Sequence, residues 1–171
     1  MRKLLFVIFL CSFLFTNGQN KYNSNGNLIG YIDKSDFLNG KHSDWFSKNY
    51  DTYTPDKKIT QKIKKKLHNI SIKSFIGSWC HDSKRVLPKF YKIMDLVEFD
   101  LEKNYKMIGI TIGKKTPNNL QKGYAIKHTP TFIFYRDGLE IGRFVEHSKK
   151  TIEKDILKIL KGGNYKNPYQ K

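Results

Sequence analysis

Cys80 lies at a position where a thiol can act as a nucleophile. It follows the apolar run 70–76 and precedes a helical pattern that begins at Ser83. The N-terminus of a helix has unpaired N–H groups and carries about half a positive charge, so it stabilises a thiolate placed there. The thiolate is the form of cysteine that attacks another sulfur atom. The sequence therefore predicts that Cys80 is reactive; the alternative is a structural thiol that packs under Trp79.

The residues that follow Cys80 are of types that assist or tune a thiolate. Ser83 stands one helical turn later and can donate a hydrogen bond to the thiolate, but its hydroxyl is a poor nucleophile toward sulfur. A protonated His81 would favour the thiolate, whereas a nearby Asp82 would disfavour it and also suits the first turn of a helix. We therefore assign Cys80 and Ser83 to catalysis, and His81 and Asp82 to tuning the ionisation of the thiol. The alternative is that these polar residues only start the helix.

The order of motifs around and beyond this site resembles the thioredoxin superfamily. Trp79-Cys80 lies at the junction of a strand and a helix, and Pro88 follows eight residues after the cysteine. Thr129-Pro130-Thr131 then opens an apolar run that ends in the turn 136–138. The resemblance covers about 59–160. It implies a cis peptide bond at Pro130 and a groove of Trp79, Thr129 and Pro130 at which a substrate chain binds as an added strand.

The chain departs from the dithiol members of this superfamily at two positions. Ser83 stands where the resemblance expects a second cysteine, so the motif is Cys-x-x-Ser. Ser74 stands where many dithiol members have a buried carboxylate for proton transfer, which puts efficient reductase turnover in doubt. The stretch 77–85 resembles a Trp-Cys-x-Asp-Ser subgroup that we associate with exported proteins of Bacteroidetes-type bacteria.

The elements that must position this site follow from hydrophobic periodicity and turn residues. Their order independently predicts an α/β fold with a central mixed sheet and helices on both faces. With the resemblance, the fold class is a thioredoxin-like three-layer α/β/α arrangement with an N-terminal helical extension. The predicted strands are 29–31, 70–76, 105–112, 131–135 and 139–144, and the predicted helices are 44–53, 54–67, 83–99, 116–124 and 149–160.

The N-terminal extension has an aromatic face. Trp45, Phe46 and Tyr50 fall on one side of the predicted helix 44–53. We expect this face to pack the extension onto the domain; the alternative is a binding surface. In the helix 54–67, Thr54 is the expected N-cap, and Ile59, Ile63 and Leu67 form an apolar stripe between lysines.

The first residues read as an export signal. Arg2 and Lys3 precede an apolar stretch that is too short to span a bilayer comfortably. Removal of the signal would also remove Cys11, which would leave Cys80 as the single cysteine of a periplasmic or extracellular protein. The alternative is an uncleaved anchor. The expected organisation is a signal peptide at 1–18, a flexible linker at 19–28, a domain at 29–160 with its core at 59–160, and a flexible tail at 161–171.

The chain is strongly basic, with a formal net charge of +17. Such a charge can indicate nucleic acid or an anionic membrane as a partner. Here the lysines are spread over the whole chain and no nucleic-acid-binding motif accompanies them, so we expect no nucleic acid as a partner. We favour a solvated basic surface, and membrane-surface contact is the alternative. The histidines are scattered without metal-ligand spacing, and no phosphate-binding loop is present, so we expect no metal and no cofactor.

Two functions remain in competition. The first is monothiol exchange, in which Cys80 attacks a substrate disulfide or a glutathione-type mixed disulfide and an external thiol resolves the adduct. The expected partners are disulfide- or thiol-containing protein substrates or low-molecular-weight thiols. The second is a non-catalytic module of the same fold that binds partner chains at Trp79 and Pro130 and has lost redox turnover. A third interpretation, a basic surface-binding protein, rests on charge alone.

Overall fold

The computed structural model describes residues 21–162 and 165–170. The predicted signal peptide at 1–18 lies outside the described residues and stays a prediction. The strands are β1 (Gly30–Ile32), β2 (Ile70–Ile76), β3 (Tyr105–Gly109), β4 (Thr131–Arg136) and β5 (Leu139–Val145). The helices are α1 (Ser35–Leu38), α2 (Ser43–Thr52), α3 (Lys57–Lys64), α4 (His81–Leu96), α5 (Leu101–Asn104) and α6 (Ile152–Leu160), with short 3₁₀ helices η1 (Gly40–His42) and η2 (Pro117–Asn119).

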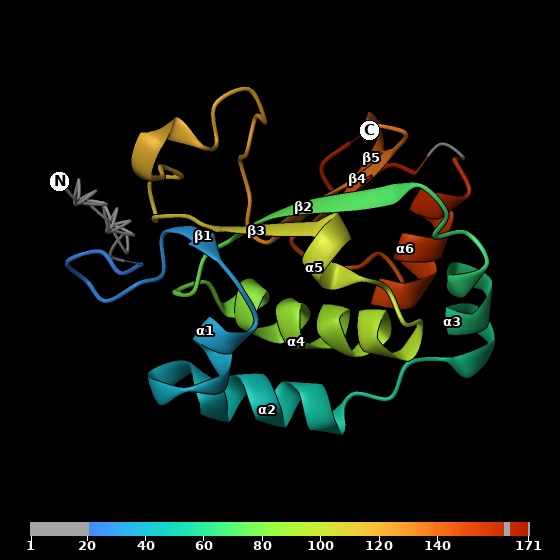
Figure 1. Cartoon of the computed structure of the whole chain (residues 1–171), viewed down its shortest axis with the longest axis horizontal. Helices are drawn as coiled ribbons and strands as arrows, with labels where there is room; N and C mark the ends of the chain where they lie inside the picture. Colours follow the sequence, from blue (N-terminus) through green and yellow to red (C-terminus); the bar gives the residue numbers. More distant parts are fainter. Residues whose placement is uncertain (1–20, 163–164, 171) are drawn as a thin grey trace, which may run out of the picture.

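The strands form one mixed sheet in the order β1-β3-β2-β4-β5 (Figure 1). β2 and β3 run parallel, and the other neighbours are antiparallel. β2 is central because its apolar residues are buried between two covered faces. β4 and β5 form a hairpin in which Asp137 and Gly138 both have positive φ, as a tight two-residue turn requires. The predicted mixed sheet with helices is confirmed.

Helices α4 and α6 cover one face of the sheet and enclose the main core. The buried side of α4 includes Leu87, Phe90 and Met94. In Figure 1, α2 lies on the far side of α4 from the sheet, and the ring of Phe46 meets that of Tyr91 edge-on, with centroids 5.7 Å apart. The aromatic face of α2 therefore packs the extension onto the domain, as predicted.

The opposite face of the sheet is covered by a loop instead of a long helix. The segment 110–128 crosses this face (Figure 1), where Leu120 and Tyr124 pack against a small cluster that includes Phe75. The predicted helix 116–124 is reduced to the 3₁₀ helix η2, because Asn118 and Asn119 have positive φ and cannot continue a right-handed helix. One face of the sheet is therefore covered by helices and the other by a loop.

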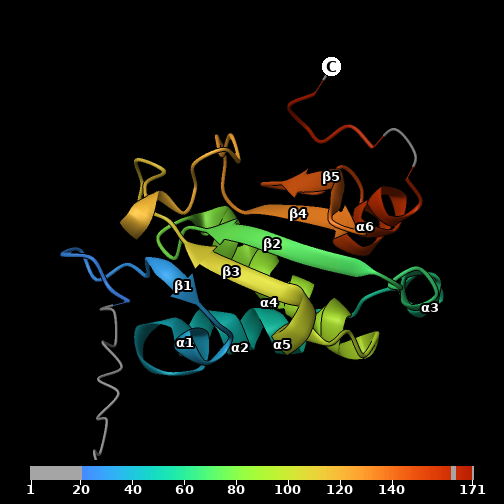
Figure 2. The same cartoon turned by 45° about the horizontal axis from the view of Figure 1, so that its top comes forward.

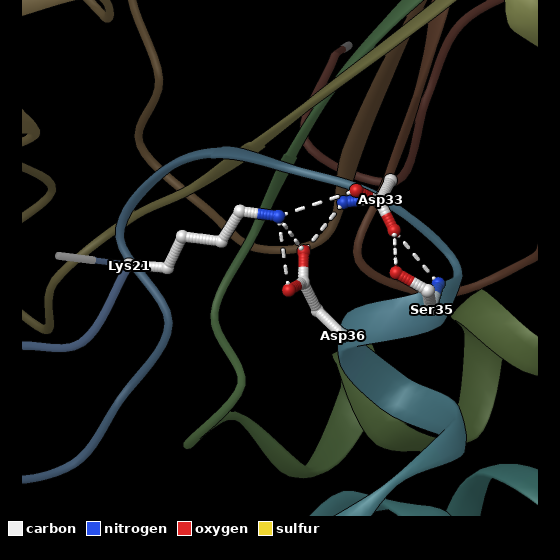
Figure 3. A network of polar contacts seen from close by, with 4 residues as sticks. All are labelled: Lys21, Asp33, Ser35 and Asp36. Carbon is white, nitrogen blue, oxygen red and sulfur yellow. Dashed lines mark hydrogen bonds and ion pairs between the residues drawn. The ribbon is translucent and has the colours of Figure 1, made fainter. Parts of the chain in front are cut away.

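The stretch 21–28 differs from the flexible linker that we expected at 19–28. Tyr22 and Leu28 form a β-bridge, and Leu28 is fully buried. Lys21 bonds to Asp36 at 2.9 Å and to Asp33 at 3.2 Å, while the Asp33 N–H donates to Asp36 (Figure 3). Burial opposes ionisation of Asp33, yet hydrogen bonds from Ser35 and Lys21 outweigh it and lower the pKa of this carboxyl. The stretch belongs to the folded domain.

The described part of the C-terminal tail, 165–170, also differs from the loose segment that we expected at 161–171. The Tyr165 hydroxyl donates to Asp155 at 3.2 Å. Asn167 is buried, and Tyr169 stacks on His128. Figure 2 shows the tail running back from the end of α6 beside β5. The tail therefore docks on the domain.

Helix α3 begins two residues later than predicted. Asp56, not Thr54, is its N-cap, and the Asp56 side chain accepts hydrogen bonds from the N–H groups of Lys58 and Ile59. Ile63 is fully buried where α3 packs near α6, so the predicted apolar stripe faces the core.

Across the described residues, none of the helices combines the length and the apolar character needed to cross a membrane.

Candidate functional site

Cys80 sits at the junction between β2 and α4. The chain turns after β2, and the Cys80 N–H donates to the Gly77 carbonyl at 2.9 Å. Cys80 is the N-cap of α4 with an extended backbone, and its carbonyl accepts the first helical hydrogen bond, from Lys84, at 3.0 Å. Its thiol is free and partly exposed. The thiol therefore lies at the N-terminus of a long helix, where a thiolate is stabilised.

The Thr129–Pro130 loop meets Cys80 from a distant part of the chain. The peptide bond between Thr129 and Pro130 is cis. The Cys80 thiol donates to the Thr129 carbonyl, with Sγ and oxygen 3.1 Å apart. The loop is held on its other side by the Glu146 N–H, which donates to the Pro130 carbonyl at 2.7 Å. The structure thus brings together Cys80, Thr129 and Pro130.

Trp79 folds back over the turn that precedes Cys80. Its indole Nε1–H donates to the Ile110 carbonyl at 2.9 Å. A Cβ atom added at Gly77 would lie 2.7 Å from Cε2 of the indole, so this close approach requires glycine. Lys114 places its ammonium 4.8 Å from the centre of the indole ring. Trp79 therefore flanks the thiol while it is fixed by the turn and by the covering loop.

Ser83 supports the turn that precedes Cys80. Its side chain is fully buried, and its Oγ accepts a hydrogen bond from the Gly77 N–H at 3.2 Å. Within the described residues no hydrogen bond joins Ser83 to Cys80, and a bond from Ser83 to the thiolate stays a prediction. The reason is geometric: the turn after β2 points an otherwise unpaired N–H at the first turn of α4, and the hydroxyl satisfies it.

The two residues between Cys80 and Ser83 have different surroundings. His81 is exposed. Asp82 forms an ion pair with Arg85, with Oδ1 and Nη2 2.7 Å apart. The positive charge of Arg85 offsets the carboxylate that would otherwise disfavour a nearby thiolate. The sequence analysis did not predict this ion pair.

Ser74 and Tyr105 fill the position where dithiol relatives are expected to have a buried carboxylate. Both side chains are buried, and their hydroxyl oxygens are 2.7 Å apart. Burial raises the pKa of Tyr105 above its ordinary value, so its hydroxyl stays neutral at physiological pH. This pair provides no carboxylate to exchange protons with Cys80.

Sequence reasoning missed a support for the Pro130 loop. The rings of His128 and Tyr169 are stacked with centroids 3.7 Å apart and an interplanar angle of 9°. The Nδ1 atom of His128 lies 3.7 Å from a carboxylate oxygen of Glu146, and the His128 carbonyl accepts from the Thr131 hydroxyl at 2.7 Å. The tail thus touches the residue that precedes Thr129. No sequence periodicity marks Tyr169, so no signal in the sequence pointed to it.

Among the residues that the structure describes, no group of three or more histidine, cysteine or acidic side chains is arranged to hold a metal ion.

Comparison with known proteins places these features in context. A family model described as Thioredoxin matches residues 52–158. Thioredoxin H9 of Arabidopsis thaliana is 26% identical over 91 residues, and an H-type thioredoxin of Populus jackii is 28% identical over 92 residues. Each match covers 53% of this chain and 60% of the relative. A thioredoxin domain-containing protein, R362, of Acanthamoeba polyphaga mimivirus is 23% identical over 131 residues, which are 71% of this chain and 36% of that protein. The chain therefore spans less than two thirds of the length of these relatives.

Solved structures with a detectable likeness include two thioredoxins. The thioredoxin of Fasciola hepatica has 19% sequence identity and a TM-score of 0.39, with 56% of this chain and 86% of that chain covered. The oxidised form of mitochondrial thioredoxin 3 from Saccharomyces cerevisiae has 20% identity and a TM-score of 0.39, with 63% and 96% covered.

Proposed function

The chain belongs to the thioredoxin family, and from this premise we propose that it is an exported protein that exchanges disulfides through the single thiol of Cys80. The family match confirms the thioredoxin-like fold class that the sequence predicted. One observation carries the proposal: the Cys80 thiol lies at the start of α4, 3.1 Å from the Thr129 carbonyl that precedes cis-Pro130. The thiol therefore lies beside the backbone of Thr129 and Pro130, along which an extended substrate chain can bind.

The exchange proceeds in two balanced steps. The Cys80 thiolate attacks one sulfur of a substrate disulfide; a bond from Sγ to that sulfur forms, and the other sulfur leaves with the electron pair of the broken bond and takes a proton from solvent. An external thiolate then attacks the substrate sulfur of this adduct, forms a new disulfide with it and releases Cys80 as the thiolate. The exchange involves no net oxidation.

Cys80 is the single cysteine among residues 21–162 and 165–170, which supports a monothiol route. The position of the second cysteine is held by Ser83, which anchors the Gly77 N–H. The sequence Trp79-Cys80-His81-Asp82-Ser83 supports placing the chain in the exported, Bacteroidetes-type monothiol subgroup. Export rests on the charged and apolar residues within 1–18. Sequencing the N-terminus of protein from the cell envelope tests export: a start near Gln19 supports it, and intact Met1 in the cytosol contradicts it.

The competing function is a non-catalytic binding module. The Ser74–Tyr105 pair favours it, because it leaves the site without the carboxylate that would move protons during turnover. The pH dependence of Cys80 alkylation discriminates between the two. A rate at pH 7 well above that of free cysteine supports exchange, and a rate equal to that of free cysteine supports the binding module.

The missing second thiol gives a direct test of the monothiol route. We expect the wild type to reduce insulin disulfides slowly with a dithiol donor, and Ser83→Cys to raise turnover by at least about tenfold, because an internal thiol resolves the adduct at high effective concentration. Ser83→Ala is the matched control, since it also loses the bond to Gly77 but adds no thiol, and Cys80→Ser sets the background. A wild type as fast as Ser83→Cys would refute the monothiol account.

A further inference from the structure

A cleft of about 370 Å³ opens beside the site, between α4 and the segment that follows β5. One wall carries Arg85 and Lys89 from α4, and the other carries His147 and Lys150. Val86 and Ile152 are buried side chains at its base. The residues of this cleft have no role in the exchange steps described above.

Both walls continue directly from the segments that hold the reacting groups. Arg85 is on the first turns of the helix that Cys80 caps, where it pairs with Asp82. His147 follows Glu146, whose N–H donates to the carbonyl of cis-Pro130. A polypeptide bound between Cys80 and Pro130 can therefore reach the cleft if it continues past this loop.

The cleft has an excess of positive charge. The described residues that line it include Arg85, Lys89 and Lys150, and none is aspartate or glutamate. Asp82 balances Arg85. The Lys89 ammonium lies 5.0 Å from the centre of the Tyr53 ring. Within the described part of the chain, neither Lys89 nor Lys150 has a carboxylate within 4.0 Å. Two ammonium groups are thus available to a ligand.

One carboxylate lies behind the cleft, but it is already occupied. Glu153 is buried and accepts a hydrogen bond from the Tyr53 hydroxyl. Burial and this bond to Glu153 raise the pKa of Tyr53, so its hydroxyl stays protonated and remains a donor. The Glu153 carboxylate is therefore buried and already bonded to a donor, so it does not pair with Lys89 or Lys150.

We propose that this cleft binds an acidic segment of the substrate polypeptide, adjacent to the disulfide that Cys80 attacks. The inference rests on the proposed exchange function and specifies its substrate class. Aspartate and glutamate side chains match the two available ammonium groups, and complementary charge raises the rate of productive encounter and fixes the register of the bound chain. The apolar base accommodates the aliphatic part of the same segment.

Matched peptides test this proposal. Each peptide carries one cysteine as a mixed disulfide with a neutral thiopyridyl group, and the peptides differ only in aspartate, serine or lysine residues on one flank. Release of thiopyridone reports the attack of Cys80. We expect the aspartate peptide to react about tenfold faster than the lysine peptide at low ionic strength, with the ratio falling as salt is added. Equal rates would overturn the proposal.

Variants locate the effect. Lys89→Gln with Lys150→Gln should reduce the aspartate-to-lysine ratio by at least about threefold. Lys62→Gln with Lys65→Gln is the matched control, because it removes the same charge from α3 and its C-cap, at the opposite end of the molecule from the start of α4 (Figure 1). An unchanged ratio in the first pair, or an equal loss in the control pair, would overturn the assignment to the cleft.

Two small disulfides separate this proposal from its premise. A neutral thiopyridyl disulfide of mercaptoethanol reports only the chemistry of Cys80, and no reaction with it would refute the exchange function itself. Oxidised glutathione is a small acidic disulfide. If the Lys89 and Lys150 variants slow its reaction as much as that of the aspartate peptide, the cleft selects small acidic thiols and the polypeptide assignment is wrong; a loss confined to the peptide supports it.

Discussion

The two ends of the described chain attach to the domain in different ways. The N-terminal extension, residues 21–53, places Phe37 and Phe46 in the main core, where they are almost completely buried. The C-terminal tail, residues 165–170, docks through the Tyr169 ring, which remains 48% exposed, and through the polar contacts of Tyr165. The extension is thus part of the core, whereas the tail docks on the outer surface of the domain.

This difference separates stability from local control of the site. Complete burial of a phenylalanine contributes about 1.5–3 kcal/mol, whereas a single aromatic contact adds about 0.5–1.5 kcal/mol. The extension packs on the outer side of α4, where the ring of Phe46 meets that of Tyr91. The tail contributes less energy but touches His128, next to Thr129. We therefore expect the extension to control whether the domain folds and the tail to control how its Pro130 loop is held.

Truncating the extension's central ring should have the largest effect. Phe46 is 1% exposed and contacts the rings of Phe37, Tyr50 and Tyr91. We expect Phe46→Ala to lower the free energy of unfolding by about 3–5 kcal/mol, because it loses apolar burial and leaves a cavity. Urea denaturation followed by circular dichroism measures the loss. Tyr31→Ala, at a ring that is 56% exposed, is the control. A similar small loss in both variants would show that the extension is not part of the cooperative core.

Acid should weaken the same extension to a smaller degree. His42 is 4% exposed, and its Nε2 has no hydrogen-bond partner among the described residues. Burial lowers the pKa of its imidazole, Lys41 and Lys84 lower it further, and Asp36 opposes them. The unfolded chain, with a histidine pKa of about 6.5, then binds the proton more readily than the folded protein. This stability is present above pH 6.5 and is lost as the pH falls toward the lower pKa of the folded state.

Unfolding free energies measured between pH 7.5 and pH 5 check the sign of this effect. His42→Phe should flatten the decline on the acid side, since it keeps an aromatic ring between Phe37 and Trp45 and removes the proton site. His68→Phe is the matched control, because His68 is exposed. If the two variants keep the same slope as the wild type, burial of His42 does not couple the extension to pH.

The same contrast explains how much the sequence could predict. Strand 70–76, the cysteine at the helix start and the Thr129-Pro130 motif were predictable, because apolar runs and fixed motifs mark them locally. The aromatic face of α2 was predictable because its helical spacing shows which side is buried. The tail was not, because the partners of Tyr165 and Tyr169 are set by the path of the chain after α6 and not by any periodicity.

The details of the site were less predictable than its composition. The sequence placed Ser83 one turn from Cys80, but only the geometry of the turn after β2 shows that its hydroxyl serves the Gly77 N–H. The loop 110–128 was mistaken in part for a helix because left-handed Asn118 and Asn119 are not marked by composition alone. In both places the residue types were compatible with more than one local structure, and the backbone conformation determined which of them formed.

Removing the Tyr169 ring from the tail should have the smallest effect on stability. It should also slow the reaction of Cys80 with a peptide disulfide, which a purely structural role would not predict. Tyr169→Ala removes the stacked ring from His128 and should lower the free energy of unfolding by less than about 1 kcal/mol, because the contact is half exposed. Freed of this ring, the loop should hold Thr129 and Pro130 less firmly, and the rate of Cys80 with a peptide disulfide should fall by about threefold. The rate with a small neutral disulfide should stay unchanged, since that reagent does not bind along the backbone of Thr129 and Pro130.

Two variants control this prediction. Tyr169→Phe keeps the stacked ring and should keep the peptide rate of the wild type, while Tyr31→Ala controls for the loss of an exposed ring. If Tyr169→Ala leaves the peptide rate intact, or slows both disulfides equally, the tail does not support the Pro130 loop and its docking is independent of the site.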